Sequence, residues 1–253
     1  MSDNDEAVYS PPPVSLFGRL SSMLRLAVFF VETAVLLPAI AIAAILTRGR
    51  SYWFWALLWS SVSMKVLGMR LVSEGRDKLE PGRNYVVASN HKSLLDPFSV
   101  VLSLGPGNET RWVGKRELLK IPVFGFALKV TGMVMIDRTD HRQAVAEIAR
   151  MRGEEGISVV FFPEGERAPG DELLPFKKGA AAFAIDSGWP LLPVAVSGSN
   201  KALPKHSMVL RPGTIRVRIG EPIETGGLSE SDRVGLTERL QASIDAMLGE
   251  LGK

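Results

Sequence analysis

A histidine and an aspartate with four residues between them follow directly after an apolar run that is typical of a buried strand. They are His91 and Asp96, in the stretch VASNHKSLLDP at residues 87–97. A carboxylate bonded to one imidazole nitrogen fixes the tautomer and leaves the other nitrogen free to accept a proton. On one regular helix the two side chains would point about 140° apart, at ~100° per residue, so contact requires a loop. The pair predicts a general base and its orienting carboxylate.

Each residue alone also has a purely structural interpretation. Asp96 precedes Pro97, and proline disfavours helical backbone in the residue before it but suits the first position of a helix. Asp96 is therefore also a natural N-cap for a helix that begins at Pro97. His91 alone is typical of a hydrogen-bonded loop histidine.

Charged residues follow two further predicted strands. Residues 133–136 are followed by Asp137 and Arg138, and residues 158–162 are followed by Pro-Glu-Gly-Glu-Arg at 163–167. A single arginine is usually a surface ion-pair partner, but arginines at neighbouring strand ends can share a crevice that binds phosphate or carboxylate. Gly165 would allow the backbone to approach such a ligand closely.

The elements that must position these residues alternate between strand and helix. Alternation of this kind predicts an α/β fold with a layered mixed sheet flanked by helices. A closing amphipathic helix is expected after Ser229. The strand candidates are 85–89, 111–113, 133–136, 158–162, 192–196 and 215–219, and the helix candidates are 97–104, 117–130, 140–153 and 177–187.

The N-terminal part of the chain contains long apolar stretches instead of this alternation. Residues 26–46, LAVFFVETAVLLPAIAIAAIL, are long and apolar enough to cross a bilayer core of roughly 30 Å. A second apolar stretch at 52–59 carries tryptophans of the kind found at the headgroup level. We therefore expect a mobile tail at residues 1–22, a membrane anchor built as a helical hairpin at 23–68, and the α/β domain at 69–253.

The orientation of this anchor is not fixed by its flanking charges, because basic residues lie on both sides of the first segment. We take this as support for a hairpin with both ends in the cytoplasm, and so for a catalytic domain on the cytoplasmic face of the inner membrane. Glu32 and Pro38 favour a shallow or bent insertion over a straight span. The flanking basic residues are Arg19, Arg25, Arg48 and Arg50.

Composition narrows the chemistry. The chain has no cysteine, which excludes disulfides, thiolate metal sites and a cysteine nucleophile. His91, His141 and His206 lack metal-ligand spacing, and the chain has neither a P-loop nor a G-x-S-x-G elbow, so no metal site and no acyl-serine enzyme are predicted. The net charge of +3 suits an anionic membrane or a phosphorylated ligand, or simply a solvated surface. Without a dense Lys/Arg stripe, nucleic acid is not expected as a partner.

Four ordered blocks of sequence resemble the glycerolipid acyltransferases of the 1-acylglycerol-3-phosphate acyltransferase type. The resemblance covers about residues 70–200. The blocks are Asn90-His91 through Asp96, for NHxxxxD; Gly114-Lys115-Arg116-Glu117-Leu118 with Pro122 and Gly125; Gly132 through Asp137-Arg138; and Phe162 through Arg167, followed by Leu192-Pro193-Val194.

This resemblance implies a reaction and roles for particular residues. His91 would take the proton from a lysolipid hydroxyl that attacks an acyl thioester of coenzyme A or acyl carrier protein, and Asp96 would hold the imidazole. No cofactor is implied beyond that co-substrate. The residues implied to bind the acceptor are Lys115, Arg138 and Arg167 for its phosphate, and Asn90, Glu164 and Gly165 for the rest of the site. Lys177 and Lys178 are more typical of a solvated surface, with phosphate binding as the alternative.

One position departs from the family pattern. Glu166 stands where the family usually has threonine, and its charge would either oppose a phosphate or pair with a neighbouring arginine. Two alternatives to phosphatidic acid synthesis therefore stay open: acylation of another lysolipid such as a lyso-ornithine lipid, and a non-catalytic lipid-binding protein on the same fold.

Overall fold

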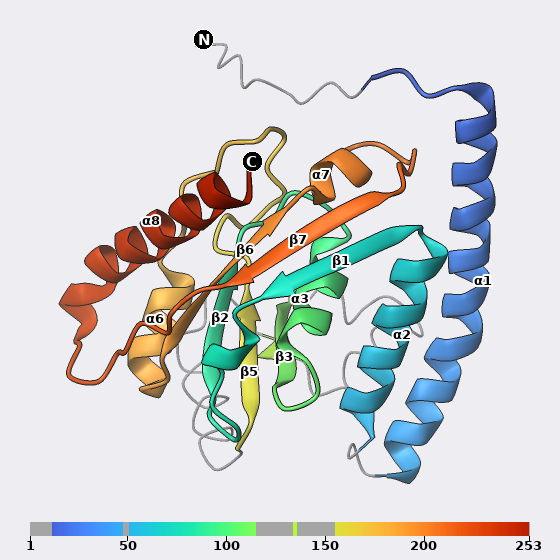
Figure 1. The fold of residues 1–253 in the computed structure, drawn as a ribbon. Coiled ribbons are helices and arrows are strands. Elements are labelled where there is room, and N and C mark those ends of the chain that lie inside the picture. The colour runs from blue at the N-terminus through green and yellow to red at the C-terminus, as the bar shows by residue number, and fades with distance from the viewer. Residues whose placement is uncertain (1–11, 48–50, 115–133, 136–154, 253) are drawn as a thin grey trace.

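The computed structural model describes residues 12–47, 51–114, 134–135 and 155–252, and its centre is a seven-stranded sheet (Figure 1). The strand order is β1-β7-β6-β2-β5-β3-β4. Neighbouring strands are parallel except β6 and β7, so the sheet is mixed, as the sequence predicted. The bounds are β1 Met69–Glu74, β2 Tyr85–Ser89, β3 Glu109–Gly114, β4 Val134–Met135, β5 Ile157–Phe161, β6 Leu191–Ser197 and β7 Gly213–Ile219.

Helices cover both faces of this sheet, and the two faces have separate cores. Helix α3 (Asp96–Leu104) lies on one face, and α6 (Gly179–Ser187) and α8 (Arg233–Leu251) lie on the other (Figure 1). Strand β2 shows why: Tyr85 and Val87 join the core on the α3 side, and Val86 and Ala88 join the core with α6 and α8. Successive strand residues point to opposite faces, so a strand in a covered sheet is apolar throughout.

Two N-terminal helices lie side by side along the edge of the domain (Figure 1). They are α1 (Leu16–Leu46) and α2 (Tyr52–Val66). Helix α1 is tied to the domain, because the Ser22 hydroxyl accepts a 2.8 Å bond from the Leu210 N–H and the Phe29 ring meets Phe98 of α3 edge-on at 6.2 Å. Because the Ser15 hydroxyl caps its first turn, α1 begins inside the segment predicted as a tail, and residues 16–22 are helical.

Two polar residues in the middle of α1 face its partner helix. Glu32 accepts a 3.1 Å bond from the Ser63 hydroxyl, and Thr33 accepts a 3.3 Å bond from the Trp59 indole. The other faces of α1 expose large apolar side chains along its whole length, from Leu16 and Phe17 to Ile45 and Leu46. By length and composition, α1 is the one helix among the described residues that could cross a membrane, and only 6% of its most apolar window is buried.

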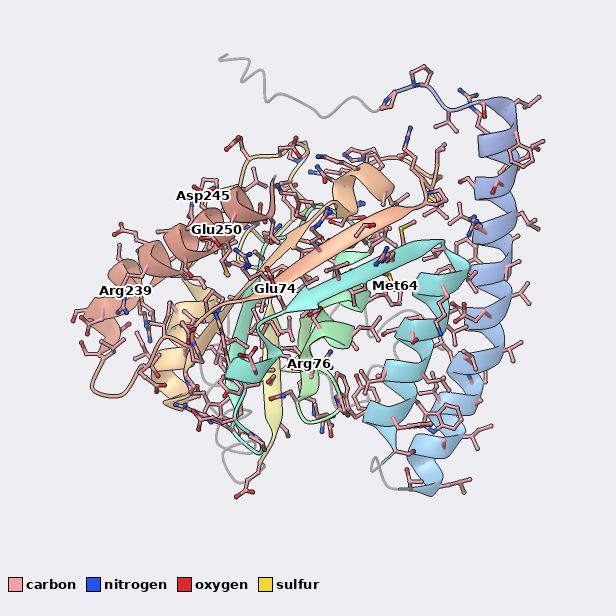
Figure 2. All side chains as sticks on the ribbon, viewed as in Figure 1. Met64, Glu74, Arg76, Arg239, Asp245 and Glu250 are labelled. Atoms are coloured by element: carbon pink, nitrogen blue, oxygen red, sulfur yellow. The ribbon has the colours of Figure 1, made fainter. Side chains whose placement is uncertain are left out.

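Helix α3 is held at its C-terminus and packs in the same core as α2. At the C-terminus, the Arg76 guanidinium donates 2.5 and 2.7 Å bonds to the carbonyls of Leu102 and Ser103. Met64 of α2 is buried in the same core as this helix; it and Arg76 are labelled in Figure 2. The N-terminus of α3 carries Asp96, so these contacts also fix the predicted site.

The predicted elements differ from the structure in a few places. Strand β1 was not predicted, because its sequence MRLVSE contains three polar residues and forms no continuous apolar run, as is common in edge strands. The single-turn helix α7 (Ser199–Ala202) is too short to give a periodic signal. The helices expected at 117–130 and 140–153 lie outside the described residues.

Candidate active site

His91 and Asp96 are in direct contact. The His91 Nδ1 lies 2.9 Å from Asp96 Oδ2, in a loop between β2 and α3. A carboxylate accepts hydrogen bonds, so in the neutral imidazole this contact favours the tautomer with the proton on Nδ1 and leaves Nε2 as the acceptor. The histidine side chain keeps 16% of its surface exposed while the aspartate has none. The histidine side chain thus reaches the surface in part, while the carboxylate that contacts it is fully buried.

The Asp96 carboxylate is itself held by the loop that carries His91. Its Oδ2 accepts bonds of 2.7 Å from the backbone N–H groups of both Lys92 and Ser93. Asp96 is the first residue of α3, with Leu95 as the N-cap. Its carboxylate therefore bonds the loop rather than the free N–H groups of its own helix, and the N-cap interpretation is wrong. The positive end of the α3 dipole still favours the charge.

The His91 ring is supported on one face by an aromatic stack. Phe162 lies 4.0 Å from it, centroid to centroid, and nearly parallel, and Trp112 of β3 stacks on Phe162 at 5.6 Å. The sheet register explains this contact. Strands β2 and β5 are parallel with Ala88 opposite Phe161, so the residues that follow them leave the sheet at the same edge. Phe162 limits the orientations of the imidazole, a role that its sequence position alone did not reveal.

Glu164 positions the backbone of the base. It is 2% exposed, its Oε1 accepts a 2.6 Å bond from the His91 N–H, and its Oε2 accepts a 2.9 Å bond from the Leu174 N–H. Burial raises the pKa of this carboxyl, while the two backbone bonds and the nearby Lys92 oppose the rise. Both oxygens are thus engaged by the protein. The part in acceptor binding predicted for Glu164 stays a prediction, and the structure gives it a positioning role.

Asn90 is fully buried and bonded to β6. Its amide nitrogen donates 2.9 Å to the Val196 carbonyl and its amide oxygen accepts 2.7 Å from the Val196 N–H. The backbone pairing of β2 with β6 ends at Ser89. Beyond it, the side chain of Asn90 makes the hydrogen bonds to β6 that a backbone group would otherwise make. The part in substrate binding predicted for Asn90 stays a prediction, and the structure shows that its side chain fixes the start of the loop that carries His91.

The loop after β5 brings other predicted residues to the same edge. The Ala168 N–H donates 2.7 Å to the His91 carbonyl, which puts the neighbouring Arg167 beside the dyad. Arg167 is half-buried and has no hydrogen-bond or ion-pair partner among the described residues. Gly165 has a φ of +79°, and the Lys177 side chain crosses it so closely that a Cβ there would collide with Nζ. The predicted Lys115 and Arg138 lie outside the described residues.

Lys92, next to the base, was not singled out from the sequence. It is buried, and its ammonium donates to the Asp171 carbonyl, while the Asp171 side chain accepts a 2.7 Å bond from Asn200 of α7. The catalytic loop is thereby tied to α7 and to the loop after β5. Within the described ranges no cluster of His, Asp and Glu could hold a metal ion.

A histidine bonded to a buried carboxylate, at the carboxyl edge of the parallel strands of an α/β sheet, has a geometry that suits a general base. A family model described as acyltransferase matches residues 70–197. The match contains the dyad, the stacking Phe162 and the positioning Glu164. The chain belongs to this acyltransferase family, as the ordered blocks predicted.

Curated relatives agree with this assignment. A chloroplastic 1-acyl-sn-glycerol-3-phosphate acyltransferase of Brassica napus is 32% identical over 86% of this chain, which spans 65% of that protein. The enzyme of the same name from Pseudomonas aeruginosa is 31% identical over 74% of this chain and 72% of its own length. The alpha form of Homo sapiens is 32% identical over 73% of this chain and 65% of that protein. The chain thus spans about two thirds of the length of these relatives.

The fold has a solved counterpart. The crystal structure of a 1-acyl-sn-glycerophosphate acyltransferase from Thermotoga maritima superposes with a TM-score of 0.79, over 92% of this chain and 97% of the other. The two sequences are 22% identical, so this likeness concerns the fold. It includes the N-terminal helices, because 92% of this chain cannot be covered by the sheet domain alone.

Proposed function

We propose that the protein transfers a fatty acyl group from a thioester of coenzyme A or acyl carrier protein to the sn-2 hydroxyl of 1-acylglycerol-3-phosphate, giving phosphatidic acid. The observation that carries the proposal is the contact of 2.9 Å between His91 Nδ1 and Asp96 Oδ2, which in the neutral imidazole leaves Nε2 as the proton acceptor. The names of the relatives support the choice of acceptor.

The proposed step needs only this base and its carboxylate. The Nε2 of His91 removes the proton of the acceptor hydroxyl while that oxygen forms a bond to the thioester carbonyl carbon. The imidazolium that results is stabilised by the ionised Asp96. When the tetrahedral intermediate collapses, the carbon–sulfur bond breaks, the imidazolium returns the proton to the leaving thiolate, and a thiol departs. No acyl-enzyme forms, in keeping with the absence of cysteine and of a nucleophile elbow.

A second acceptor, a lyso-ornithine lipid, was kept open because of Glu166. In the structure Glu166 forms a 3.0 Å ion pair with Lys205, so its charge is offset by a cation. The reason for doubting a phosphate acceptor is thereby weakened.

Product analysis tests the reaction, the acceptor and the base together. Purified wild type and His91→Ala are each given acyl-CoA with equal amounts of lysophosphatidic acid and a lyso-ornithine lipid, and the products are read by mass spectrometry. Phosphatidic acid from the wild type alone is the expected result. Acylated ornithine lipid would replace the acceptor, and no product from either donor would favour the non-catalytic lipid-binding alternative.

We further propose that α1 and α2 hold the catalytic domain on the cytoplasmic face of the inner membrane, dipping into one leaflet. The exposed apolar face of α1 and the polar pairs between α1 and α2 support this. Because the chain lacks cysteine, Leu46→Cys, at the turn of the hairpin, can be labelled specifically in sealed vesicles of either orientation. Protection from an impermeant thiol reagent on both sides is expected, and labelling from the face opposite the catalytic domain would show a full span.

A further inference from the structure

A charged cluster lies on the loop after β5, around the residue that departs from the family pattern. Glu166 Oε2 pairs with Lys205 Nζ at 3.0 Å, and the Lys177 side chain crosses the adjacent Gly165. The ammonium groups of Lys205, and then of Lys177, lower the pKa of the Glu166 carboxyl. Two lysines that are far apart in the sequence are therefore gathered around a single carboxylate.

Backbone contacts place this cluster next to the base. Lys205 is two residues from Leu203, whose carbonyl accepts a 2.8 Å bond from Ser93 in the catalytic loop. Glu166 is two residues from Ala168, whose N–H bonds the His91 carbonyl at 2.7 Å. Two residues span at most about 7 Å, so the backbones of both ion-pair partners lie close to the loop that carries the dyad.

The charges of this cluster and of the neighbouring Arg167 favour an anion with more than one negative charge. Arg167, Lys177 and Lys205 supply three cations and Glu166 supplies one carboxylate, which leaves the group positive. A phosphate monoester carries a charge of about −1.5 to −2 at neutral pH and offers three acceptor oxygens. The ornithine head group of such a lipid has one ammonium and one carboxylate, so it carries no net charge and is attracted less strongly by this cluster than a phosphate monoester.

We propose that Lys177 and Lys205 bind the acceptor's phosphate together with Arg167, and that Glu166 moderates this binding by sharing the ammonium of Lys205. The inference rests on the proposed function, since it assumes a phosphate acceptor. The diacyl product keeps the same phosphate, so contacts to it hold substrate and product alike and do not speed the chemical step. A carboxylate that competes for Lys205 weakens both complexes and eases release of the product.

The test measures the acceptor KM, kcat and inhibition by added phosphatidic acid for three variants. Lys177→Met and Lys205→Met are each expected to raise the KM for lysophosphatidic acid about tenfold, as the loss of a charge-assisted bond does, with kcat within about twofold. Glu166→Gln is expected to lower the KM about three- to fivefold, as exposed pairs do, and to lower the product inhibition constant by the same factor.

Matched controls separate the cluster from a general effect of surface charge. Lys178→Met removes the same charge from an exposed neighbour that is not among the groups acting on Glu166. Glu155→Gln removes an exposed carboxylate that precedes β5, at the opposite edge of the sheet. Both should leave the KM within about twofold of the wild type, below the effect of one exposed pair.

The outcomes distinguish the inference from the function on which it rests. Equal shifts in Lys177→Met and Lys178→Met, or an unchanged KM in Glu166→Gln, would overturn the head-group site while phosphatidic acid synthesis stands. A wild type that prefers the lyso-ornithine lipid would overturn both. Melting temperatures close to the wild type show that the KM changes do not come from unfolding.

Discussion

Asp96→Asn is the substitution that most directly tests the dyad. In the wild type, Asp96 Oδ2 accepts three bonds, from His91 Nδ1 at 2.9 Å and from the Lys92 and Ser93 N–H groups at 2.7 Å each. An asparagine can keep these contacts only with its amide oxygen in that place. Its NH₂ group then occupies the position of Oδ1, which is buried and has no partner among the described residues.

The size of the effect follows from these contacts. Each of the three bonds changes from charge-assisted to neutral, at about 1 kcal/mol each, and the unpaired buried NH₂ costs about 1–3 kcal/mol. The imidazolium formed in the transition state also loses its counter-charge. We expect kcat to fall about 10²- to 10⁴-fold, the range in which a positioned base contributes. The acceptor KM should change little, because Asp96 has no exposed surface.

The absence of cysteine makes the assay clean. Thiol released from acyl-CoA can be followed continuously with a thiol-reactive dye, since the protein contributes no thiol. Asp186→Asn is the matched control, because Asp186 pairs with Arg233 of α8 on the other side of the sheet. If kcat of Asp96→Asn stays within about threefold of the wild type, the loss is far smaller than a positioned base contributes, and the role assigned to the carboxylate is refuted.

Three further substitutions probe the support of the dyad. Phe162→Leu removes the ring stacked on His91 and should lower kcat about three- to tenfold in the same thiol assay, which corresponds to the free energy of one aromatic contact. An unchanged kcat would show that the stack does not contribute to the rate. Gly165→Ala places a Cβ at a φ of +79° and against Lys177, so its melting temperature should fall and its acceptor KM rise; if it matches Gly107→Ala, which has open space, the strain is absent. Glu164→Gln tests pH dependence: because burial raises the pKa of Glu164, its protonated form stabilises the fold below the ordinary value of 4.5, and this stabilisation is lost as pH rises through the raised pKa. The melting-temperature advantage of wild type over Glu164→Gln should therefore shrink as pH rises from 4.5, and a growing advantage would contradict the cause given for the shift.

The sequence predicted the sheet well because its central strands are buried on both faces. Strand β2 was predicted with the bounds that it has, and the predicted β5 and β6 differ by one residue at each end. The contact between His91 and Asp96 was also predicted, because both residues follow a buried strand and Pro97 favours a loop before the next helix. Edge strand β1 carries no such signal, because four of its six side chains are exposed.

The roles of individual side chains depended on contacts that spacing does not encode. Asn90 and Glu164 belong to the motifs that suggested substrate binding, yet their side chains bond the backbone of Val196, His91 and Leu174. A polar residue next to a base is as useful for holding a loop as for holding a ligand. The pairing of Glu166 with Lys205 joins positions that are 39 residues apart and arises only from the fold.

The anchor and the catalytic helix share one core, which affects how membrane attachment is best studied. Phe98 of α3 meets Phe29 of α1 at 6.2 Å and Trp59 of α2 at 5.1 Å, both edge-on. Asp96 lies two residues before Phe98, at the start of the same helix. Deleting residues 23–68 would uncover Phe98 and remove Met64 and Leu67 from the core, so the loss of activity would follow from a displaced α3. Substitutions on the exposed apolar side of α1, such as Val31→Ser and Val35→Ser, leave that core intact, so they should weaken binding to membranes while preserving kcat on a detergent-solubilised acceptor.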